Sequence, residues 1–222
     1  MHLEDRKFQK SEELRLQGRF DESAEVFKTT QRASIQRLIA AGDVDDAVRT
    51  ATQYVDQNAE IVLCEAVVRA QVDLGTALFA AGRFEECAAR LEKALDGTLR
   101  IHGEDSDPYF SGIVRVADVY RKLRRFDAAL GMVHRALQSA VQCERRRPKL
   151  VARAWSCKAS VYFDQSRITD ADHAMREAFR ILGRGKDSPE PEELLQMAKI
   201  KTAMGQSKLA ERLTEKAAAW PL

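Results

Sequence analysis

Proline, glycine and aromatic residues are scarce in this sequence. Among 222 residues there are 5 prolines and 11 glycines, and aromatic side chains make up only 7%. So few prolines and glycines exclude a collagen-like or a low-complexity disordered chain. Hydrophobic residues make up 45% and charged residues 32%, and Ala, Leu, Glu, Arg and Lys, which favour helices, are common. The composition predicts an all-α protein, long enough for one domain or two small ones.

Long apolar runs are also absent. No uninterrupted apolar stretch of about 18 residues occurs, and the best candidate, residues 61–68, is broken by Glu65, which excludes a membrane span. Charged residues occupy positions 4–7, where a secretory signal would need apolar ones. We therefore expect an intracellular, cytoplasmic protein that does not insert into membranes.

Cysteine gives no sign of a disulfide framework or of a zinc site. The 4 cysteines contain no CxxC pair, and their spacing fits no zinc-binding pattern. All of them lie in helical, partly apolar stretches, so we interpret them as small reduced core residues: Cys64, Cys87, Cys143 and Cys157.

Motifs of catalytic and cofactor sites are missing as well. There is no GxGxxG, P-loop, HExxH or GxSxG sequence. His173 and Glu177 lie four residues apart on one predicted helix face, which suits a metal half-site or a base with its orienting partner, but an exposed pair is the simpler interpretation. We expect a protein that is not an enzyme, with no catalytic residue, metal, cofactor or small-molecule substrate.

What the sequence does contain is an internal repeat. The segment at 82–88, Gly-Arg-Phe-Glu-Glu-Cys-Ala, resembles segments at 42–48, 124–130, 166–172 and 205–211. The third residue of each segment serves as an anchor, and successive anchors are 40, 42, 42 and 39 residues apart. The anchors are Val44, Phe84, Phe126, Ile168 and Ser207.

Equivalent positions relative to the anchors share a residue type. The third position after each anchor is always small, and the tenth is alanine in every unit except at Tyr54. The sixth position before the anchor is Leu or Tyr until Lys201 breaks the column. Each unit is therefore interpreted as two helices joined by a short turn, with small residues on one face of the second helix so that helices approach closely. One such hairpin cannot bury its apolar face alone, but a stack of them can.

These columns resemble the tetratricopeptide repeat. The unit near Trp155 adds the tryptophan found at the start of the family's first helix, and the resemblance covers roughly residues 22–219. The 42-residue spacing is longer than the family's usual period of about 34 and is similar to the repeats of the kinesin light chain. The best-matching unit carries Leu74, Gly75, Leu78, Gly82, Phe84, Leu91 and Ala94.

The resemblance implies a right-handed α-solenoid of antiparallel helix hairpins, with about five units. A single solenoid domain is expected over residues 21–222, preceded by an N-terminal helix within residues 1–20. A plain helical bundle is the alternative, and in it the regular spacing would be coincidence.

The sequence predicts eleven helices. The first covers 3–17, and one long helix at 21–41 serves two neighbours, because the anchor-like segment at Phe20 lies too close to Val44 for a complete unit. The other helices are expected at about 44–57, 59–81, 84–101, 108–123, 126–143, 149–165, 168–182, 190–204 and 206–219.

Local chemistry places several of the breaks between these helices. Asp107 is expected to cap the helix that begins at Pro108, and Ser188 to cap a helix that begins at Pro189. Near the end of the chain, Trp220 is expected to pack as a lid on the last unit or, alternatively, to anchor a partner.

The net charge of +2 hides an uneven distribution. Residues 108–186 carry 17 basic and 7 acidic side chains, a net charge of +10, whereas residues 58–107 have a net charge of −5. Because this basic excess spans two successive repeats, stacking would collect it into one surface that favours an acidic partner. Its densest cluster, Arg145, Arg146 and Arg147, is expected to border a groove or to be a solvated helix end.

In tetratricopeptide-repeat proteins, first helices line a groove that holds a peptide or a partner helix. By resemblance, this groove would present arginines for carboxylates and two phenylalanines as apolar anchors. It would receive Arg32, Gln36, Arg69, Val72, Thr76, Phe79, Val114, Asp118, Arg121, Arg153, Ser156, Ser160 and Phe163.

We therefore expect a non-catalytic scaffold or adaptor, either free or as a subunit of a larger assembly, that binds a protein partner with an acidic segment. The alternative is a repeat protein that contacts nucleic acid within a ribonucleoprotein through the basic block. No RNA-binding signature supports that alternative, and aromatic residues are not interleaved among the arginines.

Overall fold

The computed structural model describes residues 32–57, 65–140, 147–185 and 187–219. All regular secondary structure in these residues is α-helical. The helix expected at 3–17, the start of the helix expected at 21–41 and the Trp220 lid lie outside the described residues. The expected domain limits, 1–20 and 21–222, therefore stay a prediction.

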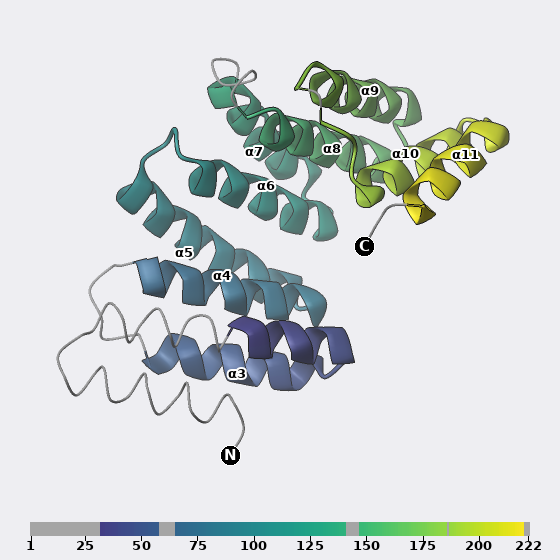
Figure 1. The fold of residues 1–222 in the computed structure, drawn as a ribbon. Coiled ribbons are helices and arrows are strands. Elements are labelled where there is room, and N and C mark those ends of the chain that lie inside the picture. The colour runs from purple at the N-terminus through teal and green to yellow at the C-terminus, as the bar shows by residue number, and fades with distance from the viewer. Residues whose placement is uncertain (1–31, 58–64, 141–146, 186, 220–222) are drawn as a thin grey trace. The chain divides into compact units, whose positions relative to one another are not determined.

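The chain divides into two compact units, Met1–Ile101 and His102–Leu222. The described part of the first unit contains a helix at 32–41 and three further helices (Figure 1): α3 (Val44–Gln57), α4 (Glu65–Ala80) and α5 (Phe84–His102). The 32–41 helix and α3 form one hairpin, and α4 and α5 form the next.

The second unit holds three consecutive hairpins. Within each, the two helices pack side by side, and α8 also packs against α6 and α7, while α10 packs against α9 (Figure 1). The hairpins are α6 (Asp107–Lys122) with α7 (Phe126–Ala140), α8 (Pro148–Asp164) with α9 (Ile168–Gly185), and α10 (Pro191–Ala203) with α11 (Ser207–Ala218).

The expected helix limits agree closely with the structure where both ends are described, although α9 continues from the expected 182 to Gly185. Two expected caps are wrong. The N-cap of α6 is Ser106, whose Oγ accepts a hydrogen bond from the Tyr109 backbone N–H at 3.3 Å. The N-cap of α10 is Glu190, which forms a capping box with Glu193. Both helices thus begin near a proline, but a neighbouring residue supplies the cap.

The turn inside every hairpin has the same backbone geometry. The residue two positions before each anchor has a positive φ, between 59° and 86°. Its N–H and the next N–H donate back to carbonyls of the first helix, as Gly82 and Arg83 do to Phe79 and Leu78. This is the Schellman arrangement, which ends a helix in a left-handed residue. Glycine fills this position in three turns, but Arg124 and Ser166 fill it in the other two.

The small columns are buried as predicted. The third residue after each anchor is fully buried in the first four units and nearly so at Ala210. In α4, a Cβ on Gly75 would lie 2.5 Å from Leu91 of α5, so the first helix approaches closely here as well. The small residues therefore set the distance between neighbouring helices.

Lys201 departs from the Leu or Tyr found at this repeat position in the other units, but it is still packed in the core. Its Nζ donates to the carboxylate of Asp172 in α9, and both side chains are almost completely buried. The other oxygen of Asp172 binds Arg176 at 2.7 Å. A charged pair thus replaces an apolar contact between successive repeats, which is tolerated because each buried charge has a partner.

None of the helices in the described part of the chain has both the length and the apolar character needed to cross a membrane.

Candidate partner-binding surface

The first helix α4 is accessible along one narrow stripe. Arg69, Val72, Thr76 and Phe79 are spaced at i, i+3, i+7 and i+10, and all four are exposed or half-buried. The side chains on the rest of the described surface of α4 are mostly buried. The spacing puts the four residues on one face of the helix, so every groove residue expected in α4 is available to a partner.

Two side chains on this stripe are held in place by neighbours. Arg69 pairs with Glu65 one turn earlier, with Nη2 and Oε1 3.1 Å apart. Phe79 packs edge-to-face on Phe84 at the start of α5, with ring centroids 5.4 Å apart. The stripe therefore presents an ordered cation at one end and an ordered aromatic ring at the other.

The helix at 32–41 adds Arg32 and Gln36, which are both exposed and one turn apart. Arg32 lies 3.7 Å from the carboxylate of Asp73, a buried residue of α4. This ion pair links the first helices of two successive repeats.

In the second unit, α6 departs from the expected register. Val114 is only 4% exposed and cannot contact a partner. The accessible stripe of α6 instead passes through Ser111, Arg115, Asp118 and Lys122.

Arg121 contributes to a network of charges rather than to an open surface. Its guanidinium binds Asp118 at 2.7 Å and Asp164, at the end of α8, at 2.6 Å. Burial opposes the charged form, but the two carboxylates outweigh it and raise the pKa of Arg121. With its side chain 15% exposed, Arg121 fastens α6 to α8.

On α8 the expected groove residues have three different environments. Arg153 is exposed and has no ion-pair partner among the described residues. Phe163 is half-buried. Ser156 is only 7% exposed, so it does not offer a surface to a partner as expected. Arg153 is thus an accessible cation of this helix.

Both serines of α8 serve the contact with α10. Gln196 donates to the Ser156 carbonyl at 2.8 Å and to Ser160 Oγ at 2.5 Å, and Ser156 Oγ donates to Glu193 at 3.2 Å. Burial raises the pKa of Glu193, although its hydrogen bonds partly offset that effect. The sequence does not predict this contact role for Glu193 and Gln196. Polar residues near a helix start carry no signal of a partner 36 or more residues away.

Within the arginine cluster, only Arg147 is described. Its Nε lies 2.7 Å from Asp107, and its Nη1 donates to the Asp105 carbonyl at 2.6 Å. Arg147 therefore ties the start of α8 to the loop before α6. Arg145 and Arg146 lie outside the described residues.

Two of the cysteines and the His173–Glu177 pair lie in the described residues. Cys87 and Cys157 are buried, and burial raises the pKa of Cys157 to about 12. Glu177 binds Arg180 at 2.7 Å, and no cluster of potential metal ligands that includes His173 occurs in the part of the chain described. These two cysteines fit the interpretation as core residues, and Cys64 and Cys143 lie outside the described residues.

Comparison with known proteins places this arrangement in a class. Two sequence profiles, both described as Tetratricopeptide repeat, match residues 67–142 and residues 32–98. Together they span half of the chain. No curated protein matches the sequence.

Solved structures show the same fold at low identity. BtubC (BKLC) from P. vanneervenii is 17% identical, with a TM-score of 0.69 over 97% of this chain and 87% of that one. A kinesin light chain protein of Podosopora anserina with nearly identical TPR-like repeats is 17% identical, with a TM-score of 0.65 over 86% and 93%. PlcR of Bacillus thuringiensis, solved with the peptide PapR7 and DNA, is 13% identical, with a TM-score of 0.66 over 86% and 68%.

The protein is therefore an all-α helical-repeat solenoid. It belongs to the tetratricopeptide-repeat family, as the repeat columns predict, and its fold is shared with the repeats of kinesin light chain proteins.

Proposed function

We propose that the chain is a non-catalytic interaction scaffold that holds an acidic segment of a protein partner along the accessible stripe of the first helix α4. One observation carries the proposal: Arg69, Val72, Thr76 and Phe79 form the accessible stripe of α4, while the helix is otherwise mostly buried. This stripe is the part of α4 that is open to a partner, and its accessibility supports the proposal.

The chemistry of the stripes suits an amphipathic segment with carboxylates. Arg69 on α4 supplies planar donors that match a carboxylate, and Arg153 offers the same chemistry separately on α8 of the second unit. Val72 and Phe79 supply apolar contact area, which a purely electrostatic surface would lack. Arg121 has a positioning role in this proposal, because Asp118 and Asp164 already occupy its donors.

The comparisons support a peptide-like partner without identifying it. PlcR shares the fold and was solved with a peptide. We propose that this chain works in a related way, as a free adaptor or as a subunit of a larger assembly.

The proposal is tested by blocking the α4 stripe with a bulky side chain. Thr76 is exposed, so Thr76→Trp should leave the melting temperature nearly unchanged and remove the partner. The measurement is quantitative mass spectrometry of proteins cross-linked to purified wild-type and variant chains in a lysate of the source organism.

Thr214→Trp is the matched control. Thr214 is also exposed, and its hydroxyl donates to the carbonyl four residues earlier, as the hydroxyl of Thr76 does, but it lies on a second helix, α11. A protein captured by wild type and by Thr214→Trp but lost with Thr76→Trp supports the stripe. Equal capture by all three chains contradicts it.

A further inference from the structure

A different side of α8 carries a lysine at a position that is core in the neighbouring repeats. Lys158 is half-buried, and so are Trp155 and Tyr162, one turn before and one turn after it. The three residues share one helix face. In α6 and α10, the positions equivalent to Trp155 and Lys158 are buried and uncharged: Ile113, Val116, Leu194 and Met197. This side of α8 is thus partly open where the same side of its neighbours is closed.

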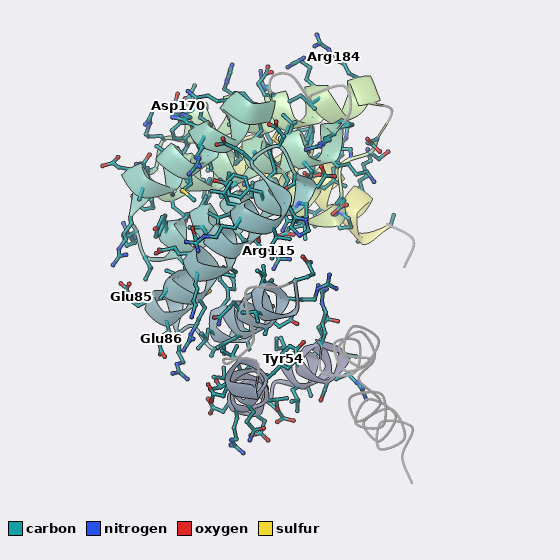
Figure 2. All side chains as sticks on the ribbon, turned by 90° about the vertical axis from the view of Figure 1, so that its left-hand side faces the viewer. Tyr54, Glu85, Glu86, Arg115, Asp170 and Arg184 are labelled. Atoms are coloured by element: carbon teal, nitrogen blue, oxygen red, sulfur yellow. The ribbon has the colours of Figure 1, made fainter. Side chains whose placement is uncertain are left out.

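The open side is an aromatic and cationic cluster. The Lys158 ammonium lies 4.8 Å from the Trp155 ring centroid and 5.7 Å from that of Tyr162. The Arg167 guanidinium lies 4.4 Å from the Tyr162 centroid. Asp170, labelled in Figure 2, binds Arg167 with 2.7 Å between Nη2 and Oδ2. Rings hold the cations in place, but they accept no ordinary hydrogen bond from the ammonium.

Lys158 has no carboxylate partner among the described residues. Burial lowers its pKa, the positive charge of Arg167 lowers it further, and Asp170 offsets this only in part. Burial lowers the pKa of His134 in α7, and the positive charge of Lys158 lowers that pKa further. The cluster therefore contains a partly desolvated cation with no carboxylate partner among the described residues, and an anion that joined it would stabilise its charge.

We propose that Trp155, Lys158 and Tyr162 form a second binding site, separate from the first-helix stripes, that receives a carboxylate from an acidic segment of a protein partner. The charge of the cluster is complementary to such a segment. A nucleic acid fits less well, because base stacking needs a free ring face, and Lys158 and Arg167 both lie against the Tyr162 ring.

Tryptophan fluorescence tests this site directly. The chain has 2 tryptophans, so Trp220→Phe leaves Trp155 as the single reporter. In this background, poly-L-glutamate at low salt should change the Trp155 emission in a saturable way. Lys158→Met should weaken the apparent affinity about tenfold or more, as expected for a lost charge-assisted hydrogen bond, and Lys158→Arg should retain most of it.

The melting temperature and a matched lysine variant distinguish a loss of binding from a loss of structure. Because methionine fills the equivalent position at Met197, Lys158→Met should fold with an unchanged or higher melting temperature. Lys199→Met, at an exposed lysine of α10, should leave the Trp155 response intact.

Several results would overturn the proposal. One is a Trp155 emission that does not change when poly-L-glutamate is added. Another is equal binding of poly-L-glutamate by wild type and Lys158→Met. A clear drop in the melting temperature of Lys158→Met would make Lys158 a structural residue. A stronger, Lys158-dependent response to poly(U), or an equal response to inorganic phosphate, would assign the site to nucleic acid or to a free anion.

Discussion

At the scale of single residues, several basic side chains form ion pairs within the molecule and are therefore not free to bind a partner. Arg121 fastens α6 to α8, Arg147 fastens a loop, and Lys201 pairs with Asp172 in the core. Arg153 and Lys158 differ from these three residues, because neither has an ion-pair partner among the described residues. A count of basic residues therefore overstates the charge offered to a partner.

Removing one partner of the Asp172–Lys201 pair should lower the free energy of unfolding far more than replacing both partners by apolar residues. Asp172→Ala leaves Lys201 buried without its counter-charge and should lower the free energy of unfolding by about 3–5 kcal/mol. Asp172→Leu combined with Lys201→Leu should cost far less or even stabilise, because apolar residues occupy the equivalent positions in other repeats. Urea unfolding of Asp172→Leu, Lys201→Leu and the double variant measures this, and additive losses would contradict it.

Glu193 should make stability depend on pH. Its pKa is raised in the folded state, so the folded protein binds this proton more tightly than the unfolded chain does. The ionised group therefore costs stability at neutral pH, and the cost disappears as the pH falls below the usual carboxyl range, about 4.

The matched variant for this effect is Glu193→Gln, which keeps an acceptor for Ser156 but does not titrate. We expect Glu193→Gln to be more stable than wild type at pH 7 and equally stable near pH 4. Urea titrations at both pH values provide the comparison, and a difference that does not change with pH would refute the assignment.

At the scale of elements, the turn within each hairpin demands a left-handed residue, and the chain does not always supply glycine. Ser166 adopts a φ of 61°, a conformation that costs a residue with a Cβ about 1–2 kcal/mol. Ser166→Gly should therefore raise the free energy of unfolding by up to about 1 kcal/mol, after the entropy lost by glycine is subtracted. Chemical denaturation measures the gain.

The reverse change provides the check. Gly82 has a φ of 71°, and nothing lies within 4 Å of an added Cβ, so Gly82→Ala tests backbone strain without a steric clash. It should lower the stability, and a neutral result at both turns would mean that this backbone conformation is not strained.

The second element-scale feature is the close approach of helices at the small column. Ala129 is completely buried, whereas the preceding residue, Ala128, is exposed. Ala129→Trp should cost at least about 3 kcal/mol, because an indole cannot enter the contact, and it should lower the melting temperature strongly. Ala128→Trp adds the same side chain on the solvent side and should change it little. Similar melting temperatures for the two variants would rule out this register.

At the scale of the whole molecule, the basic block from 108 to 186 should act through a few accessible cations rather than through its full charge of +10. Arg153→Glu should weaken binding of the natural partner and reduce the salt dependence of that binding, without a change in melting temperature, because Arg153 has no internal ion pair to lose. Surface plasmon resonance at rising salt measures both effects.

Arg212→Glu, at an exposed arginine of α11, makes the same charge change on a second helix and should have little effect. If both variants weaken binding equally, only the net charge matters. Tight RNA binding that persists in rising salt would favour the nucleic-acid alternative over the scaffold.

The sequence by itself determined the repeat, the helix limits and the small columns. These features are periodic and local: a residue such as Ala171 reports its environment through its spacing from Ala129 and Ala210, and the turn segments mark each hairpin. Helix boundaries follow from prolines, glycines and apolar spacing within a few residues, so they needed no knowledge of distant contacts.

Only the tertiary structure decided which polar residues are accessible and which are used in internal contacts. Asp164 reaches Arg121 from 43 residues away and Gln196 reaches Ser160 from 36, and no local pattern encodes these pairs. Val114 of α6 is buried, although the same repeat position is accessible at Val72 in α4. The burial of one helix position and long-range ion pairing depend on how whole hairpins pack, and the energies involved, about 1 kcal/mol per exposed pair, are too small to leave a signature in the sequence.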